Sequence, residues 1–179
     1  MEDHYGKPVA RPVHPASLGP DALFAQCQMS RGKTSGPGGQ HRNKVQTQVV
    51  LLHTPSGISA QAGERREPEV NKRVALRRLR LDLAVQFRVA VPAGDIRSAL
   101  WRDRCRGGKI GCGLRHADFP SILAEALDVI AACSYDIKKA AMRLDVSMSQ
   151  MVKLLAKHPP ALALVNRRRE QLGLHPMRA

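Results

Sequence analysis

Residues 35–44, Ser-Gly-Pro-Gly-Gly-Gln-His-Arg-Asn-Lys, restrict the fold of this chain more than any other stretch. The three glycines carry no Cβ and take positive φ easily, and the proline has no N–H for a strand ladder. This stretch is therefore expected to be a loop. Residues 27–31 before it and 45–53 after it have the composition of strands. The sequence predicts two strands joined by a long, glycine-rich connection.

The next elements continue a small mixed unit. Residues 54–57, Thr-Pro-Ser-Gly, have the composition of a tight turn, and residues 58–62 then alternate apolar and polar, which predicts a hairpin. A helix is expected to begin at Pro68, because proline suits a first helical turn. Four apolar residues at spacings of three and four predict its buried stripe: Leu76, Leu79, Leu83 and Phe87.

Beyond residue 90 the pattern changes. Residues 97–115 are basic and glycine-rich, and they predict a linker or an adaptable RNA-facing segment. From Asp118 onward apolar periodicity predicts four helices, the third of them after a capping box at Ser147–Gln150. The second and third helices resemble a helix-turn-helix.

We therefore expect an α+β chain, in which a small sheet-and-helix domain precedes an all-α, helix-turn-helix-like bundle. The expected organisation is a flexible lead-in over 1–19, the sheet-and-helix domain over 20–90, a basic linker over 91–117, the helical domain over 118–174 and a tail over 175–179.

The charge of the chain indicates a polyanionic partner. Lysine and arginine number 29 against 15 acidic residues, which gives a net charge of +14. The two parts of the chain on either side of residue 90 carry +7 each, so the charge is spread and not confined to a tail. Aromatic residues make up 3%, too few for a base-stacking platform.

Several kinds of site lack support in the sequence. The loop has no G-K-[ST] ending, and neither a G-x-G-x-x-G nor an H-E-x-x-H spacing is present. We expect no cofactor, no metal and no membrane segment; a zinc site using Cys105, Cys112 and His116 is a minor alternative, because its fourth ligand is unclear. The four irregularly spaced cysteines suit a reducing cytoplasm.

The expected loop can approach another surface closely and can present its backbone N–H groups as hydrogen-bond donors. Without Cβ atoms its tip can enter a narrow cleft, and its N–H groups can stabilise a developing oxyanion without any pKa requirement. Gln40, by contrast, cannot exchange a proton near neutral pH.

This string resembles the motif of bacterial and organellar peptide-chain release factors. The resemblance rests on Gly38-Gly39-Gln40 within residues 35–44, on the turn at 54–58, on Glu64-Arg65, and on Asn71 with Ala75-Leu76 before Leu79. It covers roughly residues 20–90. The resemblance implies a catalytic domain that enters the peptidyl transferase centre and hydrolyses the ester of P-site peptidyl-tRNA.

The resemblance also implies roles for individual residues. Gly38, Gly39 and Gln40 would be catalytic, with the Gln40 N–H stabilising the transition state or the leaving group and its side chain positioning water. Contacts to 23S-type ribosomal RNA are expected from residues of both domains: Arg31, Lys33, Ser35, His41, Arg42, Asn43, Lys44, Arg65, Arg66, Arg104, Arg106, Lys109, Arg167, Arg168 and Arg169. Arg42 departs from the family, which usually has an aliphatic residue there.

No codon-reading element is recognisable, so the chain looks more like the short, codon-independent rescue hydrolases. We expect a monomer in the bacterial cytoplasm that binds the ribosome, with the mRNA channel of the small subunit as a further candidate contact. The trigger stays open: truncated mRNA, a free large subunit carrying peptidyl-tRNA, or another stall. The alternatives are a DNA regulator that uses the helix-turn-helix, or a ribosome-binding factor without hydrolysis.

Overall fold

The computed structural model describes residues 12–32 and 47–178. These residues divide between two compact units. The N-terminal unit is Pro15–Phe87, and the C-terminal unit contains residues 12–14 and everything from Arg88 onward. The boundary lies three residues before the expected end of the first domain. Residues 15–19, expected in the lead-in, belong to the N-terminal unit, where the buried Ala16 accepts a 3.0 Å hydrogen bond from Arg80 Nε.

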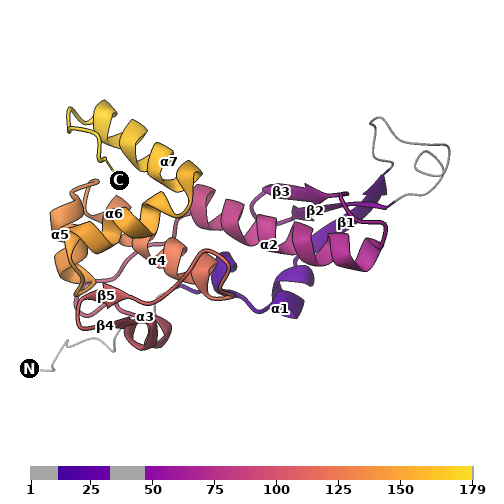
Figure 1. Cartoon of the computed structure of the whole chain (residues 1–179), viewed down its shortest axis with the longest axis horizontal. Helices are drawn as coiled ribbons and strands as arrows, with labels where there is room; N and C mark the ends of the chain where they lie inside the picture. Colours follow the sequence, from indigo (N-terminus) through magenta and orange to yellow (C-terminus); the bar gives the residue numbers. More distant parts are fainter. Residues whose placement is uncertain (1–11, 33–46, 179) are drawn as a thin grey trace, which may run out of the picture. The chain divides into compact units, whose positions relative to one another are not determined.

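The N-terminal unit is a three-stranded antiparallel sheet with a long helix on one face (Figure 1). Its elements are η1 (Pro15–Ser17), α1 (Pro20–Phe24), β1 (Cys27–Gly32), β2 (Gln48–His53), β3 (Ser59–Ala62) and α2 (Pro68–Gln86). The strands follow one another in the order β1-β2-β3, so the predicted hairpin is confirmed. Its turn ends at Gly57, whose φ of +70° glycine adopts without strain.

Alternation along the strands produces the core of this unit. Val49, Leu51 and His53 of β2 are buried on the face that α2 covers, as are Ala60 and Ala62 of β3. The helix supplies the predicted stripe of Leu76, Leu79 and Leu83. Phe87, expected in the same stripe, is instead the extended residue that ends the helix.

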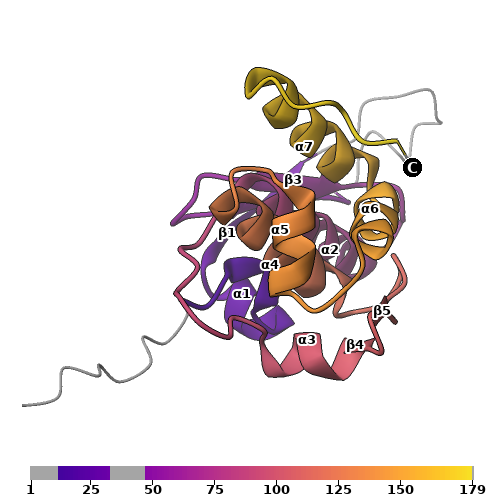
Figure 2. The same ribbon diagram turned by 90° about the vertical axis from the view of Figure 1, so that its left-hand side faces the viewer.

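The C-terminal unit is helical except for one small hairpin. Its elements are α3 (Ala99–Arg104), β4 (Cys105–Arg106), β5 (Lys109–Ile110), α4 (Phe119–Ala132), α5 (Ile137–Arg143), α6 (Met148–Ala156) and α7 (Pro159–Gln171). Every residue of α4 from Phe119 to Ile130 is buried, and α5 and α6 both pack on this helix (Figure 2). The structure thus confirms the expected α+β class with a helical second part.

The stretch expected as a linker carries α3 and the β4–β5 hairpin. Trp101 is 1% exposed, and its Nε1–H donates to the Leu144 carbonyl at 2.8 Å. Ser98 caps α3 by accepting from the Trp101 N–H at 2.9 Å and is itself held by the Glu125 carboxylate. These contacts reach far along the chain, so they leave no local periodicity from which the elements could be predicted.

The predicted capping box before α6 forms in part. Ser147 Oγ accepts from the Gln150 N–H at 3.2 Å, as expected. The Gln150 side chain instead accepts from the Ile110 N–H at 3.3 Å, which ties α6 to β5. Among the described residues, no helix is both long enough and apolar enough to cross a bilayer.

Candidate functional site

The strand ladder of β1 and β2 fixes where the glycine-rich stretch begins and ends. Pairing runs from Cys27 opposite His53 to Gly32 opposite Gln48, so the chain leaves and re-enters the sheet at neighbouring positions on the last rung. The predicted catalytic residues Gly38, Gly39 and Gln40 lie outside the described residues. So do six of the predicted RNA contacts: Lys33, Ser35, His41, Arg42, Asn43 and Lys44.

The last rung places a glycine of β1 close to the Gln48 side chain. A Cβ at Gly32 would lie 3.0 Å from Gln48 Oε1, which is closer than ordinary van der Waals contact. Gln48 is held in place on the other side, because its Nε2 donates to Gln61 Oε1 of β3 at 2.9 Å. The end of the sheet that bears the connection is therefore bound across all three strands.

Asn71 anchors the residue at which the connection returns. Its Nδ2 donates to the Thr47 carbonyl at 2.6 Å and to the Arg65 carbonyl at 2.8 Å, while its Oδ1 accepts from the Arg65 N–H at 3.0 Å. The residue is fully buried. One side chain of α2 thus joins the start of β2 to the segment that leads into the helix.

Sequence reasoning assigned no role to Asn71, although a signal was present. Asn71, Ala75, Leu79 and Leu83 follow one another at helical spacing, and all four are buried. A polar residue on an apolar stripe needs hydrogen-bond partners in the interior. The position of Asn71 on this stripe therefore indicates that its side chain holds neighbouring backbone groups in place.

Three predicted RNA contacts lie among the described residues of this unit. Arg31 is exposed on β1, one position before the last rung, and Arg65 and Arg66 are exposed just before α2. Since Asn71 holds the Arg65 backbone and Thr47 together, Arg65 borders the base of the connection. Nearby, Glu64 pairs with Arg78 at 2.7 Å, and the hydrogen bond to this guanidinium lowers the pKa of the carboxyl group.

Among the predicted RNA contacts of the C-terminal unit, some side chains form ion pairs or hydrogen bonds within the protein and others do not. Arg104 grips the Asp118 carboxylate with Nε at 2.9 Å and Nη2 at 2.7 Å. Arg169 donates to the Tyr135 and His175 carbonyls, and Arg168 donates to Gln171. Arg106 pairs with Asp103 on the surface. The side chains of Lys109 and Arg167 are exposed and form no hydrogen bond or ion pair with a described residue.

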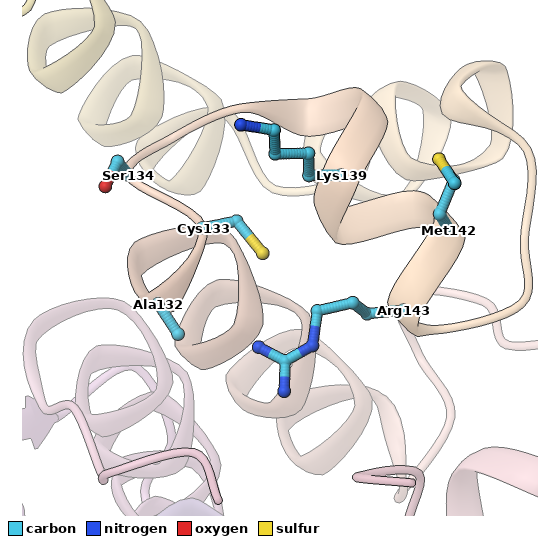
Figure 3. Close-up of a pocket in the computed structure, with 6 residues that line it drawn as sticks. All are labelled: Ala132, Cys133, Ser134, Lys139, Met142 and Arg143. Carbon is cyan, nitrogen blue, oxygen red and sulfur yellow. The ribbon is translucent and has the colours of Figure 1, made fainter. Parts of the chain in front are cut away.

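A shallow pocket of about 440 Å³ lies between the end of α4 and helix α5 (Figure 3). Ala132, Cys133 and Ser134 line one side, and Lys139, Met142 and Arg143 line the other. The lining contains a thiol and a hydroxyl but no histidine or carboxylate that could activate either group. Arg143 is partly engaged, because its Nη2 donates to the Pro92 carbonyl at 3.0 Å. The residues that line this pocket therefore include no general base that could activate a nucleophile.

The cysteines do not form a metal centre within the part of the chain that the structure describes, where no three Cys, His, Asp or Glu side chains converge. Burial raises the pKa of Cys105 to about 12 and also raises that of Cys112. Both thiols are therefore protonated, and weakly nucleophilic, at neutral pH.

Comparison with known proteins places the glycine-rich stretch in a recognised domain. Residues 24–100 match the RF-1 domain family. The chain is 40% identical over 62 residues to "Peptide chain release factor 1" of Acidiphilium cryptum, covering 35% of this chain and 18% of the relative. It is 44% identical over 61 residues to "Mitochondrial translation release factor in rescue" of Danio rerio, covering 34% and 38%.

A longer match, 33% identical over 88 residues, is to "Peptide chain release factor 1" of Rhodospirillum rubrum and covers 49% of this chain and 24% of that protein. The chain thus spans less than two-fifths of the length of each of these relatives. No solved structure matches it significantly.

Proposed function

We propose that this chain hydrolyses the ester bond of peptidyl-tRNA on the ribosome, because residues 24–100 match the RF-1 domain family and the similar proteins are named as release factors. The observation that carries the proposal is the position of Gly38-Gly39-Gln40 inside the matched domain, between two strands whose last rung is described. The ribosome would supply the binding site for the tRNA ester, and this chain would supply the Gly38-Gly39-Gln40 segment that enters it.

In the proposed reaction a water molecule attacks the ester carbonyl, and the bond between that carbon and the ribose oxygen breaks. The peptide leaves with a carboxyl group, and the ribose oxygen takes up a proton from the water to become a hydroxyl. The Gln40 N–H would donate to the oxygen that gains charge, a contribution that is independent of pH near neutrality. The Gln40 amide would orient the water, and the two glycines would leave room for the approach. Arg31, Arg65 and Arg66, exposed near the base of the connection, would bind phosphates of the ribosomal RNA.

The test is peptide release from ribosomes that carry labelled peptidyl-tRNA in the P site. We expect Gln40→Ala and Gly39→Ala to lower the release rate by roughly 100-fold or more, the usual effect of losing a transition-state donor or its geometry. Gln86→Ala is the matched control, because Gln86 is an exposed glutamine at the end of α2. Equal rates for wild type and both loop variants would refute hydrolysis and leave a ribosome-binding factor.

We further propose that release does not require a stop codon. One of the similar proteins is named as a release factor in rescue, which supports this proposal. Release should therefore be as fast on ribosomes stalled at the end of a truncated mRNA as on ribosomes with a stop codon in the A site, or faster. Release confined to stop-codon complexes would contradict this part of the proposal and leave the hydrolysis itself intact.

A further inference from the structure

The β4–β5 hairpin presents an unusually bare tip. Arg106 pairs with Lys109, and only Gly107 and Gly108 connect them. These glycines have φ of +56° and +71°, the left-handed conformation at both positions that a tight two-residue hairpin turn requires. A Cβ at either position would meet nothing within 4 Å, so the backbone of the tip faces open space.

The body of the hairpin is held firmly behind this tip. Ile110 is 8% exposed, and its N–H donates to the Gln150 side chain of α6. The Gly111 N–H donates to the Arg104 carbonyl at 2.7 Å. Because successive side chains of a strand point to opposite faces, the pair formed by Arg106 and Lys109 points away from buried Ile110. Both cations are exposed.

Carboxylates hold the other arginines of this region. Asp95 binds Arg97 at 3.0 Å and Arg102 at 3.0 Å, and Asp118 binds Arg104. The remaining acid, Asp103, lies 2.8 Å from Arg106 Nη2, and its backbone carbonyl accepts from Arg106 Nε at 3.2 Å; the Asp103 and Arg106 side chains are 53% and 79% exposed. An ion pair as open as this contributes little, and a phosphate can replace it.

In helix α7, two of the three arginines are held by hydrogen bonds to neutral groups of the same unit. Arg169 is committed to two backbone carbonyls and Arg168 to a neighbouring amide. Only Arg167 of that arginine run forms no hydrogen bond or ion pair with a described residue. The hairpin, by contrast, pairs two exposed cations directly across a turn.

We propose that the β4–β5 hairpin binds the phosphate backbone of RNA, with Arg106 and Lys109 on either side of a phosphate and the glycine N–H groups at the tip as further donors. Cations and backbone N–H groups are the usual partners of nucleic-acid phosphates. The tip has no apolar side chain to form the core of a protein interface. The choice of RNA over DNA rests on the proposed function.

The experiment measures binding of the full-length chain to a fluorescein-labelled RNA duplex by anisotropy over a range of salt concentrations. Each lost phosphate contact lowers the slope of log K against log salt by about one. Arg106→Gln combined with Lys109→Gln should therefore weaken binding and reduce the slope by about two. Lys138→Gln combined with Lys139→Gln is the matched control, since both lysines are exposed on α5, lie outside the expected RNA contacts, and carry the same total charge.

Equal losses in the two double variants would overturn the proposal, because the effect would then be one of net charge alone. So would a hairpin-dependent affinity for polyglutamate with RNA binding unchanged, which would assign an acidic protein partner. Circular dichroism melting should show the same transition in all variants, as expected for exposed residues. Gln40→Ala should keep full RNA binding, so a failure of the hydrolase proposal remains distinguishable from a failure of this one.

Discussion

A single buried amide, that of Asn71, holds Thr47, the first described residue after the segment 33–46. In Asn71→Asp the carboxylate would still accept from the Arg65 N–H, but it could no longer donate to the Thr47 and Arg65 carbonyls. We expect the free energy of unfolding to fall by about 3 kcal/mol, because two buried acceptors lose their donor. Urea denaturation followed by circular dichroism measures this.

The control for Asn71→Asp is the same change at Asn166. Asn166 also donates to one carbonyl, that of Met177 near the end of the chain, and is only part-buried. A loss below about 1 kcal/mol is expected there. Similar losses at the two positions would contradict the anchoring role of Asn71.

His53 makes the N-terminal unit sensitive to mild acid. The imidazole is 2% exposed, with Nε2 3.0 Å from Gln26 Oε1 and Nδ1 2.7 Å from Ser56 Oγ. Desolvation lowers its pKa from 6.5, so the folded unit binds this proton less readily than the unfolded chain does. Stability should therefore be complete above about pH 6.5 and fall as the pH drops below that value.

Urea midpoints measured between about pH 7.5 and pH 5 check this dependence. The variant His53→Gln lacks the titrating group, so its midpoint should change less over the same range. An equally steep decline in the variant would assign the effect to other groups.

At the scale of elements, the sequence predicts those held by local patterns. Alternation in β2 and β3 and the stripe of α2 are properties of neighbouring residues, and the structure confirms these elements. Helix α3 and the β4–β5 hairpin were missed, because Trp101 and Ser98 are held by residues 43 and 27 positions away. The resemblance is the basis for proposing Gly38-Gly39-Gln40 as catalytic, whereas the bonds of Arg104 and Arg169 depend on partners that only folding brings close.

The bond between Trp101 and Leu144 should matter for the whole C-terminal unit. Trp101→Phe removes the Nε1 donor, and the buried Leu144 carbonyl loses its partner. We expect the free energy of unfolding to fall by about 1–3 kcal/mol. Urea denaturation followed by circular dichroism measures the loss, and Arg102→Ala, an exposed change on the same helix, should cost much less. Equal effects would show that α3 is peripheral.

At the scale of the whole molecule, the division after Phe87 predicts where the chain can be cut. A fragment ending at Phe87 contains every strand of the three-stranded sheet and all of α2, so it should fold and give dispersed amide resonances. A fragment ending at Ile96 should be no more stable, because Arg88 and Val89 would lack the Asp128 carboxylate that they bind in the full chain. Unfolded spectra for the shorter fragment alone would place the boundary later.

The same truncation tests the division of labour between the units. Without the C-terminal unit, the proposed ribosome rescue should be lost even though the N-terminal unit folds. Retained rescue by the fragment would mean that the helical unit is not required for finding the substrate.

The last rung shared by β1 and β2 has a consequence for how the sequence of this protein can evolve. Because Gly32 and Gln48 pair directly, the register of the sheet is set without reference to residues 33–46. Substitutions in that segment should therefore alter peptide release while leaving the melting temperature of the domain nearly constant. In a library of variants, activity and stability would vary independently there and together at Thr47, which Asn71 holds. Substitutions in residues 33–46 can therefore be selected for their effect on peptide release without lowering the stability of the N-terminal unit.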